Sequence, residues 1–424
     1  MGIKLTKKEK DWILYDVGNS AFTLLVATIL PIYFNYMAEN AGLSSVDYLA
    51  YWGYAASIGT IIVALAGPVL GTMADIRGYK KKLFLSSIII GVAGCCILGI
   101  ARGWLIFLII YIVAKIGFSG SIIFYDSMLS DVTTEDRMDY ISSLGYAWGY
   151  IGSCIPFALS LIVVLKSDTI GMEMAMLISF LIVAAWWLVM SIPLLKGYEQ
   201  KYYVEKREYA VKDSFVRLGN TFQNIKKEKA VFMFLLAFFF YIDGVYTIID
   251  MATAYGSALG LNSVGLLLAL MVTQIVAFPC AIIFGKLSDR IKTKDLINVC
   301  IIAYLGIAIF AIFLKTQPQF WILAVLVGMF QGGIQALSRS YFAKIIPEEK
   351  SGEYFGLMDI CGKGASFMGT TIVSLVSQIT GNINIGVGTI AVFFVVGIIL
   401  FRKSVALSEG NIKSGINAIS SEAV

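Results

Sequence analysis

Long apolar runs alternate with short polar loops along nearly the whole chain. A membrane-spanning helix needs about 20 mostly apolar residues, and twelve runs approach or exceed that length. They cover residues 12–37, 48–74, 83–101, 104–130, 140–165, 172–195, 230–254, 264–285, 296–314, 319–344, 353–378 and 384–401. Each run is continuous, unlike the ~10-residue alternating segments of a membrane β-barrel. The pattern predicts an all-α polytopic membrane protein with twelve transmembrane helices.

Two loops in different halves of the chain have similar sequences. Residues 71–81 and residues 285–294 both follow an apolar run, contain an aspartate, and end in basic residues. One offset of 214 positions relates three pairs: Asp75 and Asp289, Glu135 and Glu349, Tyr140 and Tyr354. A register kept across all three pairs indicates two copies of one membrane unit. We therefore expect two pseudo-symmetric six-helix bundles.

The duplication divides the chain into four parts. These are an N-terminal bundle (1–195), a cytoplasmic linker (196–229), a C-terminal bundle (230–403) and a cytoplasmic tail (404–424). Apolar residues recur in the linker at helical spacing: Phe215, Leu218, Phe222 and Ile225. This spacing predicts a short amphipathic helix at the membrane surface. The tail is polar and rich in serine, and we expect it to be disordered.

The distribution of charge predicts the orientation in the membrane. The chain is 58% hydrophobic and only 14% charged, against about 25% charged in soluble domains. Of its 33 lysines and arginines, Arg102, Lys166 and Lys315 fall on one side, and Lys115, Arg339 and Lys363 fall within segments. All the others share the side of the N-terminus, which predicts that both termini are cytoplasmic. The net charge of +5 therefore reflects topology and gives no reason to expect nucleic-acid binding.

Residue types that carry much enzyme chemistry are missing or dispersed. The chain has no histidine, and its six cysteines lie in apolar segments without C-x-x-C spacing. A nucleophile–base pair or a metal-binding pattern is not recognisable. We therefore expect no cofactor, no metal and no enzymatic activity.

Several motifs resemble known transporters. The stretch from Gly71 to Lys81, G-x-x-x-D-x-R-G-x-K-K, resembles the loop motif of the major facilitator superfamily. The second copy falls where that superfamily keeps a degenerate version, with Lys292 in place of a glycine. Residues 15–22, 125–131 and 241–245 are similar to the branch related to fungal vacuolar amino-acid effluxers, and residues 131–137 are similar to cation-coupled glycoside symporters. The resemblance implies the major facilitator fold, a central cavity lined by the first, fourth, seventh and tenth helices, and amino-acid efflux.

Polar stripes run along the first and seventh segments, which are equivalent in the two halves. Their members follow i, i+3, i+4, i+7: Asp16, Asn19, Ser20 and Thr23 in the first, and Asp243, Tyr246, Thr247 and Asp250 in the seventh. Such stripes cannot face lipid, because a charge in the bilayer is costly. They face either a cavity or another helix, where they would serve packing.

Counting residues from the segment ends places four polar side chains near the membrane midplane. These are Lys115, Asp243, Gln331 and Lys363. We expect Lys115 to bind an anionic group of the substrate and Asp243 to bind a cationic group or a proton. Other candidate substrate-binding residues are Gln335, Asn19 and Tyr246. Lys363 has an alternative partner in Asp359, four residues earlier on the same helix.

Coupling to an ion would depend on carboxylates, because imidazole is absent. A buried carboxylate can have its pKa raised toward neutrality and carry a proton. Asp243 and Asp250 are the main candidates for this role, followed by Asp16. Sodium remains an alternative through the same oxygen ligands.

Charged residues near the cytoplasmic side predict a gate. Asp126 and Arg339 occupy nearly equivalent positions in the two halves, and we expect them to approach one another when that side is closed. Asp289 is an alternative partner for Arg339. Within the loop motif, Asp75 can lie at a helix N-terminus, and the motif would lock one conformation. The gate set also includes Arg77 and Arg290, and the basic residues Arg77, Lys80, Lys81 and Lys82 are expected at the cytoplasmic face.

These observations favour a secondary active transporter of a small polar, charged metabolite such as an amino acid. It would work by alternating access, with the two halves rocking about a central site. The alternatives are a flippase for a lipid or lipid-linked headgroup and a non-transporting sensor on the same scaffold. We expect a monomer in the bacterial plasma membrane that interacts with the lipid bilayer, with protons or sodium, and with a small-molecule or lipid substrate.

Overall fold

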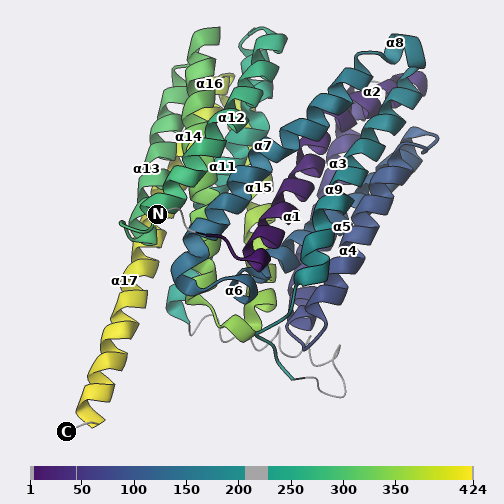
Figure 1. Ribbon diagram of the computed structural model, residues 1–424. Coiled ribbons are helices and arrows are strands. Elements are labelled where there is room, and N and C mark those ends of the chain that lie inside the picture. The colour runs from purple at the N-terminus through teal and green to yellow at the C-terminus, as the bar shows by residue number, and fades with distance from the viewer. Residues whose placement is uncertain (1–3, 44, 206–227, 423–424) are drawn as a thin grey trace. The chain divides into compact units, whose positions relative to one another are not determined.

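The computed structural model describes residues 4–43, 45–205 and 228–422, and nearly all of them are helical (Figure 1). The first part contains α1 (Lys7–Ala27), α2 (Ile29–Asn40), α3 (Ser45–Ala74), α4 (Lys80–Leu98), α5 (Trp104–Ser127), α6 (Leu129–Val132), η1 (Glu135–Arg137), α7 (Met138–Val164), α8 (Ser167–Ile170) and α9 (Met172–Gly197). The second part contains α11 (Lys229–Ala258), α12 (Ser263–Leu287), α13 (Thr293–Ile312), α14 (Gln317–Ile345), η2 (Glu348–Lys350), α15 (Ser351–Thr380), α16 (Ile383–Gly388) and α17 (Ile390–Glu422). The β pairing found among these residues is an isolated parallel bridge between Ile76 and Val204.

The chain forms two compact units. Unit 1 comprises Met1–Val211 together with Glu348–Leu357, and unit 2 comprises Lys212–Pro347 together with Met358–Val424. The first turns of α15 therefore belong to unit 1, although the rest of that helix belongs to unit 2. Helices within each unit pack laterally on one another, as expected when their backbone polar groups are satisfied internally and only side chains meet.

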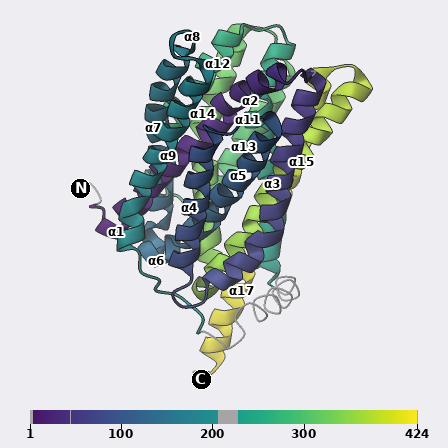
Figure 2. The ribbon, with the colours of Figure 1, turned by 90° about the vertical axis from the view of Figure 1, so that its right-hand side faces the viewer.

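Unit 1 is held together by close contacts between small residues and aromatic rings. Helix α4 packs on α5 and α9, and α1 packs on α7 and α9 (Figures 1 and 2). Trp187 of α9 is fully buried, and a Cβ added at Gly91 of α4 would overlap its ring. On α7, a Cβ at Gly149 would lie 2.7 Å from Ser20 Oγ, and one at Gly152 would lie 2.5 Å from Val17 Cγ1. These two glycines thus mark a close contact between α7 and α1.

The first membrane span is broken between α1 and α2. Thr28 leaves helical geometry with φ −129° and ψ −73°, and its hydroxyl donates to the carbonyl of Leu24 at 2.5 Å. Pro31 lies in the first turn of α2 and has no N–H to donate. A proline four residues after Ala27 also clashes with that residue's carbonyl, which explains the break.

Unit 2 has a comparable core. Helix α11 packs on α17, α12 packs on α14, and α13 packs on both α14 and α17. A Cβ at Gly397 of α17 would lie 2.8 Å from the Cβ of Tyr241, so these two helices approach closely. Helix α17 extends beyond the ends of its neighbours in unit 2 and carries the C-terminus (Figure 2).

The predicted spans correspond to helices, but their predicted number is not confirmed. Eleven helices of the described residues are long and apolar enough to cross a membrane, so the predicted count of twelve is not confirmed. The predicted segment 353–378 is α15, which has the required length but is not among the eleven. It carries Glu353, Asp359 and Lys363 as well as many small and hydroxyl residues, which lower its hydropathy.

The tail and the linker were expected to be disordered and amphipathic-helical, respectively. In the structure the tail is helical, because α17 continues to Glu422. Ser404, where the tail begins, is fully buried and donates to the carbonyl of Ala230 at 2.7 Å. This contact fixes the start of the tail as helix, and each further residue adds a hydrogen bond at little cost. The amphipathic helix predicted in the linker lies outside the described residues.

Candidate functional site

The loop-motif aspartate of unit 1 is buried at the start of α15. Asp75 is fully buried and accepts hydrogen bonds from the backbone N–H of Gly352 (2.7 Å) and of Glu353 (3.0 Å). These are among the first N–H groups of α15, which have no partner within their own helix. Burial raises the pKa of the Asp75 carboxyl to about 7, and nearby Lys80 and the two N–H donors oppose that rise. Asp75 therefore lies at a helix N-terminus, as the sequence predicted.

Glycines at the contact allow the two backbones to meet. A Cβ at Gly71 would overlap the carbonyl oxygen of Gly352, and a Cβ at Gly352 would lie 2.5 Å from the carbonyl oxygen of Gly71. Both clashes involve backbone atoms, which cannot rotate away. Gly78, at the far end of the motif, has a φ of +77°, a conformation that residues with a Cβ rarely adopt.

A buried ion pair supports the loop motif, and the sequence analysis did not identify it. Lys80 is fully buried rather than exposed at the cytoplasmic face. Its Nζ donates to Ser351 Oγ (2.8 Å), to the carbonyl of Ser127 (3.2 Å) and to Asp131 Oδ2 (3.4 Å). Asp131 is also fully buried and accepts from the Tyr198 hydroxyl. The signal was present, because Asp131 belongs to a stretch that resembles known transporters.

Residues 198–205, named here the strap, connect α9 to the loop motif. The N–H of Val204 donates to the carbonyl of Asp75 at 2.8 Å, and the N–H of Arg77 donates to the carbonyl of Val204 at 3.1 Å. Gln200 Oε1 accepts from the N–H of Gly78 at 3.0 Å. The strap therefore holds the loop in place through backbone and amide groups.

Asp131 also anchors the strap. Its Oδ1 accepts from the N–H groups of Lys201 (3.0 Å) and Tyr202 (3.1 Å). Burial, together with the neighbouring Asp131 carboxylate, raises the pKa of the Tyr198 phenol well above its usual value. Asp131 thus receives hydrogen bonds from Lys80, from Tyr198 and from two backbone groups of the strap.

The structure gathers the polar residues of the first span within unit 1. Asp16 and Asn19 are both buried, and Asn19 Nδ2 donates to Asp16 Oδ1 at 3.4 Å. The hydroxyl of Tyr125, on α5, donates to Asp16 Oδ2 at 3.0 Å. Asp16 thus joins α1 to α5, which agrees with the packing interpretation of this stripe.

Lys115 reaches from α5 to α3. Its Nζ donates to the carbonyl of Ala56 (2.7 Å) and to Thr60 Oγ1 (2.9 Å). A Cβ at Gly59 would lie 3.2 Å from Cδ of Lys115, so the lysine stem lies along the helix surface at that glycine. The side chain is half-buried, and these contacts fix its ammonium group.

Asp243 of α11 is a buried carboxylate with one unsatisfied oxygen. Oδ1 accepts from the N–H of Gly369 (3.0 Å) and from Thr247 Oγ1 (3.2 Å). Oδ2 is buried and has no hydrogen-bond partner among the described residues. A Cβ at Gly369 would overlap Asp243 Oδ1, so this glycine is what lets the backbone of α15 reach the carboxylate. A buried carboxylate oxygen without a donor is costly and requires an explanation.

Gln331 of α14 is buried and lines a small cavity of about 50 Å³ in unit 2. Thr273 and Gln274 of α12 line the same cavity, whose walls are otherwise mostly apolar. Gln274 Oε1 is buried without a hydrogen-bond partner in the described part of the chain. The sequence analysis missed Gln274, although a glutamine inside the apolar stretch 268–287 could have drawn attention to it.

The remaining predicted residues differ in exposure. Asp126, Gln335 and Tyr246 are half-buried, Arg339 is buried, and Asp250, Asp289, Arg77 and Arg290 are exposed. The coupling role of Asp250 stays a prediction. The side chain of Lys363 is outside the described part of the structure, so the predictions for this residue stay predictions. The approach of Asp126 to Arg339 stays a prediction.

The chemistry of the two units follows from these contacts. Unit 1 contains the buried cation–carboxylate pair and a carboxylate bonded to a helix N-terminus. Unit 2 contains a carboxylate and an amide that each have one oxygen without a hydrogen-bond partner among the described residues. Within the described ranges, side chains of histidine, cysteine, aspartate and glutamate form no group that could hold a metal ion. Hydrogen bonding and proton or cation binding are therefore the chemistry that these residues offer.

Sequence comparisons identify proteins related to this chain. A family model described as "Vacuole effluxer Atg22 like" matches residues 6–414. The uncharacterized MFS-type transporter YxiO of Bacillus subtilis is 46% identical over 404 residues, covering 94% of each chain. Autophagy-related protein 22 of Eremothecium gossypii is 24% identical and covers 92% of this chain and 89% of its own.

A structural comparison identifies the fold. The crystal structure of the human organic anion transporter MFSD10 superposes with a TM-score of 0.71 and covers 94% of this chain and all of its own. Only 12% of the aligned residues are identical, so this likeness defines the fold and not the substrate. The fold is that of the major facilitator superfamily, a class of multi-pass membrane transporters and not of enzymes.

Proposed function

The chain belongs to the family of Atg22-like vacuole effluxers, and on that premise we propose that it is a secondary active transporter of a small, polar, charged metabolite. An amino acid or a compound of similar size and charge is the proposed substrate. Transport occurs by alternating access and is coupled to protons or sodium through a buried carboxylate.

The observation that carries this proposal is the environment of Asp243. A fully buried carboxylate on a membrane-spanning helix is retained at a cost that packing alone does not offset. Its Oδ1 is held by Gly369 and Thr247, whereas its Oδ2 is directed to no donor among the described residues. A proton, a sodium ion or a substrate ammonium group would each satisfy that oxygen.

Three further residues complete the proposed substrate site. The ammonium of Lys115 is fixed by Ala56 and Thr60 and binds the carboxylate of the substrate. Gln331 and Gln274 line one cavity, and both have the amide groups needed to bind polar atoms of the substrate. Lys363, Gln335, Asn19 and Tyr246 remain secondary candidates for this site.

The proposed conformational cycle uses the loop motif and a gate. The bonds from Gly352 and Glu353 to Asp75 stabilise one conformation, and breaking them accompanies the change to another. Asp126 and Arg339 approach one another when the cytoplasmic side closes. Exchanging the two charges in a double variant should restore part of the transport lost in each single variant. Failure to restore any transport would contradict this gate.

The test of function is uptake into proteoliposomes. Asp243→Asn should abolish accumulation of labelled amino acids supplied as a mixture, because asparagine keeps the volume but has no negative charge and takes up no proton. Asp295→Asn is the matched control, since Asp295 is an exposed aspartate of the same unit. Both proteins are checked for folding by size-exclusion chromatography. Unchanged accumulation by the folded Asp243→Asn protein would overturn the assignment of this carboxylate.

The coupling ion is identified with separate gradients in the same vesicles. Proton coupling predicts accumulation after a pH jump without sodium, and sodium coupling predicts accumulation after a sodium jump at constant pH. Lys115→Gln should raise the substrate concentration needed for half-maximal uptake, while Lys115→Arg retains the charge and should partly preserve affinity. Equal behaviour of the two lysine variants would argue against a charge-dependent role.

A further inference from the structure

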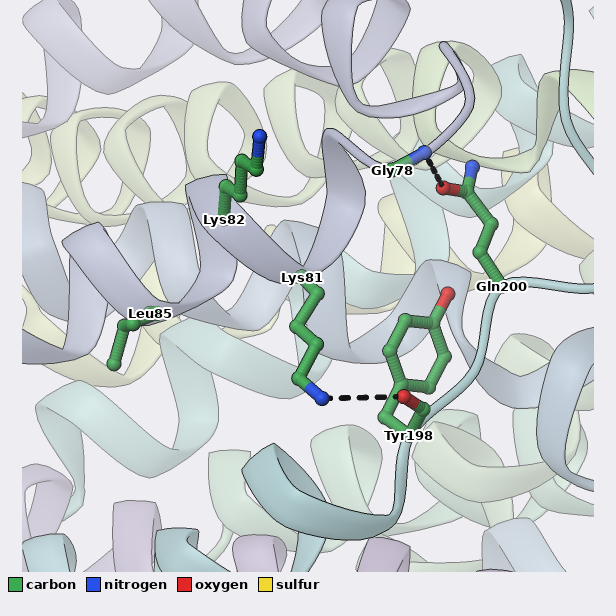
Figure 3. Close-up of a pocket in the computed structure, with 6 residues that line it drawn as sticks. All are labelled: Gly78, Lys81, Lys82, Leu85, Tyr198 and Gln200. Atoms are coloured by element: carbon green, nitrogen blue, oxygen red, sulfur yellow. Dashed lines mark hydrogen bonds between the residues drawn. The ribbon is translucent and has the colours of Figure 1, made fainter.

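A cavity of about 310 Å³ lies at the junction of α4, the loop motif and the strap. It is lined by Gly78, Lys81, Lys82, Leu85, Tyr198 and Gln200 (Figure 3). Its volume is in the range of small-molecule binding pockets. We propose that this cavity binds the phosphate headgroup of an anionic phospholipid.

The charge of the cavity suits a phosphate. Two of its lining residues are lysines and none is acidic. Helix α4 begins at Lys80, so the first N–H groups of the helix add positive potential at this end. Lysine ammonium groups and a helix N-terminus together form a favourable environment for an anion.

The lysines retain donors for a ligand. Lys81 Nζ donates to the carbonyl of Tyr198 at 3.5 Å, which uses one of its three hydrogens (Figure 3). Lys82 is exposed, and its ammonium lies 5.9 Å from the centre of the Tyr79 ring. The two side chains leave α4 in different directions (Figure 3), so one charge borders the strap and the other faces away from it.

An apolar path continues from the cavity along α4. Leu85 lines the cavity and is 41% exposed, and Ile89 and Ile97 on the same helix are 54% and 44% exposed. Residues 81, 85 and 89 follow one another at intervals of four, so each lies on the same side of the helix as its neighbour in this series. A phospholipid whose phosphate is held at Lys81 can therefore place an acyl chain along this stripe.

The lipid is favoured over free phosphate because of that stripe and the predicted topology. The cavity lies where the spans Lys80–Leu98 and Met172–Gly197 end, on the side that the charge distribution predicts to be cytoplasmic. Anionic lipids give the cytoplasmic leaflet a negative surface potential, and each nearby lysine contributes about 1 kcal/mol to binding. The site is separate from Asp243 and does not depend on the transport proposal.

The experiment measures lipid binding to the delipidated full chain in detergent. Phosphatidylglycerol and phosphatidylcholine with identical acyl chains are titrated while the unfolding temperature is recorded, and bound lipids are counted by native mass spectrometry. Wild-type protein should bind phosphatidylglycerol more tightly. Lys81→Gln with Lys82→Gln should weaken phosphatidylglycerol binding about tenfold or more and leave phosphatidylcholine binding unchanged.

The matched control removes the same charge elsewhere. Lys286→Gln with Lys292→Gln neutralises two exposed lysines of the second loop and should retain the preference for phosphatidylglycerol. An equal loss of phosphatidylglycerol binding in both double variants would show that exposed lysines attract the lipid in general, and it would overturn the proposed site. Stabilisation by inorganic phosphate alone, equal to that by phosphatidylglycerol, would overturn the lipid assignment, as would a wild-type protein with no preference between the two lipids.

Discussion

The two copies of the loop motif share a sequence pattern but differ in structure. In the first copy Asp75 is fully buried and bonded to the start of α15, whereas in the second copy Asp289 is exposed after the end of α12. Gly78 has a φ of +77°, while Lys292 at the equivalent position has a φ of −58°. The second copy therefore has no residue suited to the left-handed turn.

The difference extends to the lysine that follows. Lys80 is fully buried and pairs with Asp131, whereas the equivalent Lys294 pairs with Glu409, whose side chain is 53% exposed. The repeated sequence thus serves a buried network in unit 1 and a solvated loop in unit 2. Duplication preserved the pattern, and the surroundings of each copy determine its physical role.

The largest expected effect comes from breaking the buried ion pair. Lys80→Met should lower the free energy of unfolding by about 3–5 kcal/mol, because it leaves the Asp131 carboxylate buried without its cation. Lys294→Met should cost less than about 1 kcal/mol, because its ion pair is partly solvated. Unfolding in detergent micelles measures both. Similar losses in the two variants would contradict the contrast between the copies.

The next effect is on pH dependence. The Asp75 carboxyl holds its proton to about pH 7 in the folded chain, against a usual pKa of 3.8. Between these values the folded state binds more protons than the unfolded state, so stability falls as pH rises, by up to about 1.4 kcal/mol per pH unit. Asp75→Asn should remove this component, and Asp289→Asn should retain it. The measurement is the unfolding temperature from pH 4 to pH 8, and a slope that survives in Asp75→Asn would contradict burial as its cause.

A smaller effect concerns the turn glycine. Gly78→Ala should cost about 1–2 kcal/mol, because alanine is disfavoured at a φ of +77°. Lys292→Ala should change stability by less than about 0.5 kcal/mol, because its φ of −58° suits any residue with a Cβ. The difference between the two unfolding temperatures tests whether the turns really diverge.

The smallest effect is expected at the motif arginines. Arg77 pairs with Glu205 at 3.6 Å, but the two side chains are 64% and 73% exposed. Arg77→Gln should therefore cost less than about 1 kcal/mol, and Arg290→Gln, also at an exposed position, should behave alike. A large loss in Arg77→Gln alone would mean that the strap depends on the contacts of the Arg77 guanidinium, with Glu205 and with the Tyr203 ring at 4.9 Å, and not on its backbone bonds.

Much of the fold could be predicted because bilayer insertion depends on local sequence. Every predicted apolar segment is helical. The loop-motif pattern led to the family, and it placed Asp75 at a helix N-terminus. The apolar segments depend on residues close in the chain, whose hydropathy and backbone preferences can be read directly.

The environment of each charge was decided by tertiary structure. The sequence showed Lys80, Lys81 and Lys82 as three neighbouring lysines, yet only the first is fully buried, because Asp131 and Ser351 come to it from positions far along the chain. For the same reason, the sequence did not indicate that the first copy of the motif is buried and the second exposed. Local pattern determined which segments enter the membrane, while burial and pairing depended on partners 50 to 280 residues away, which no local pattern specifies.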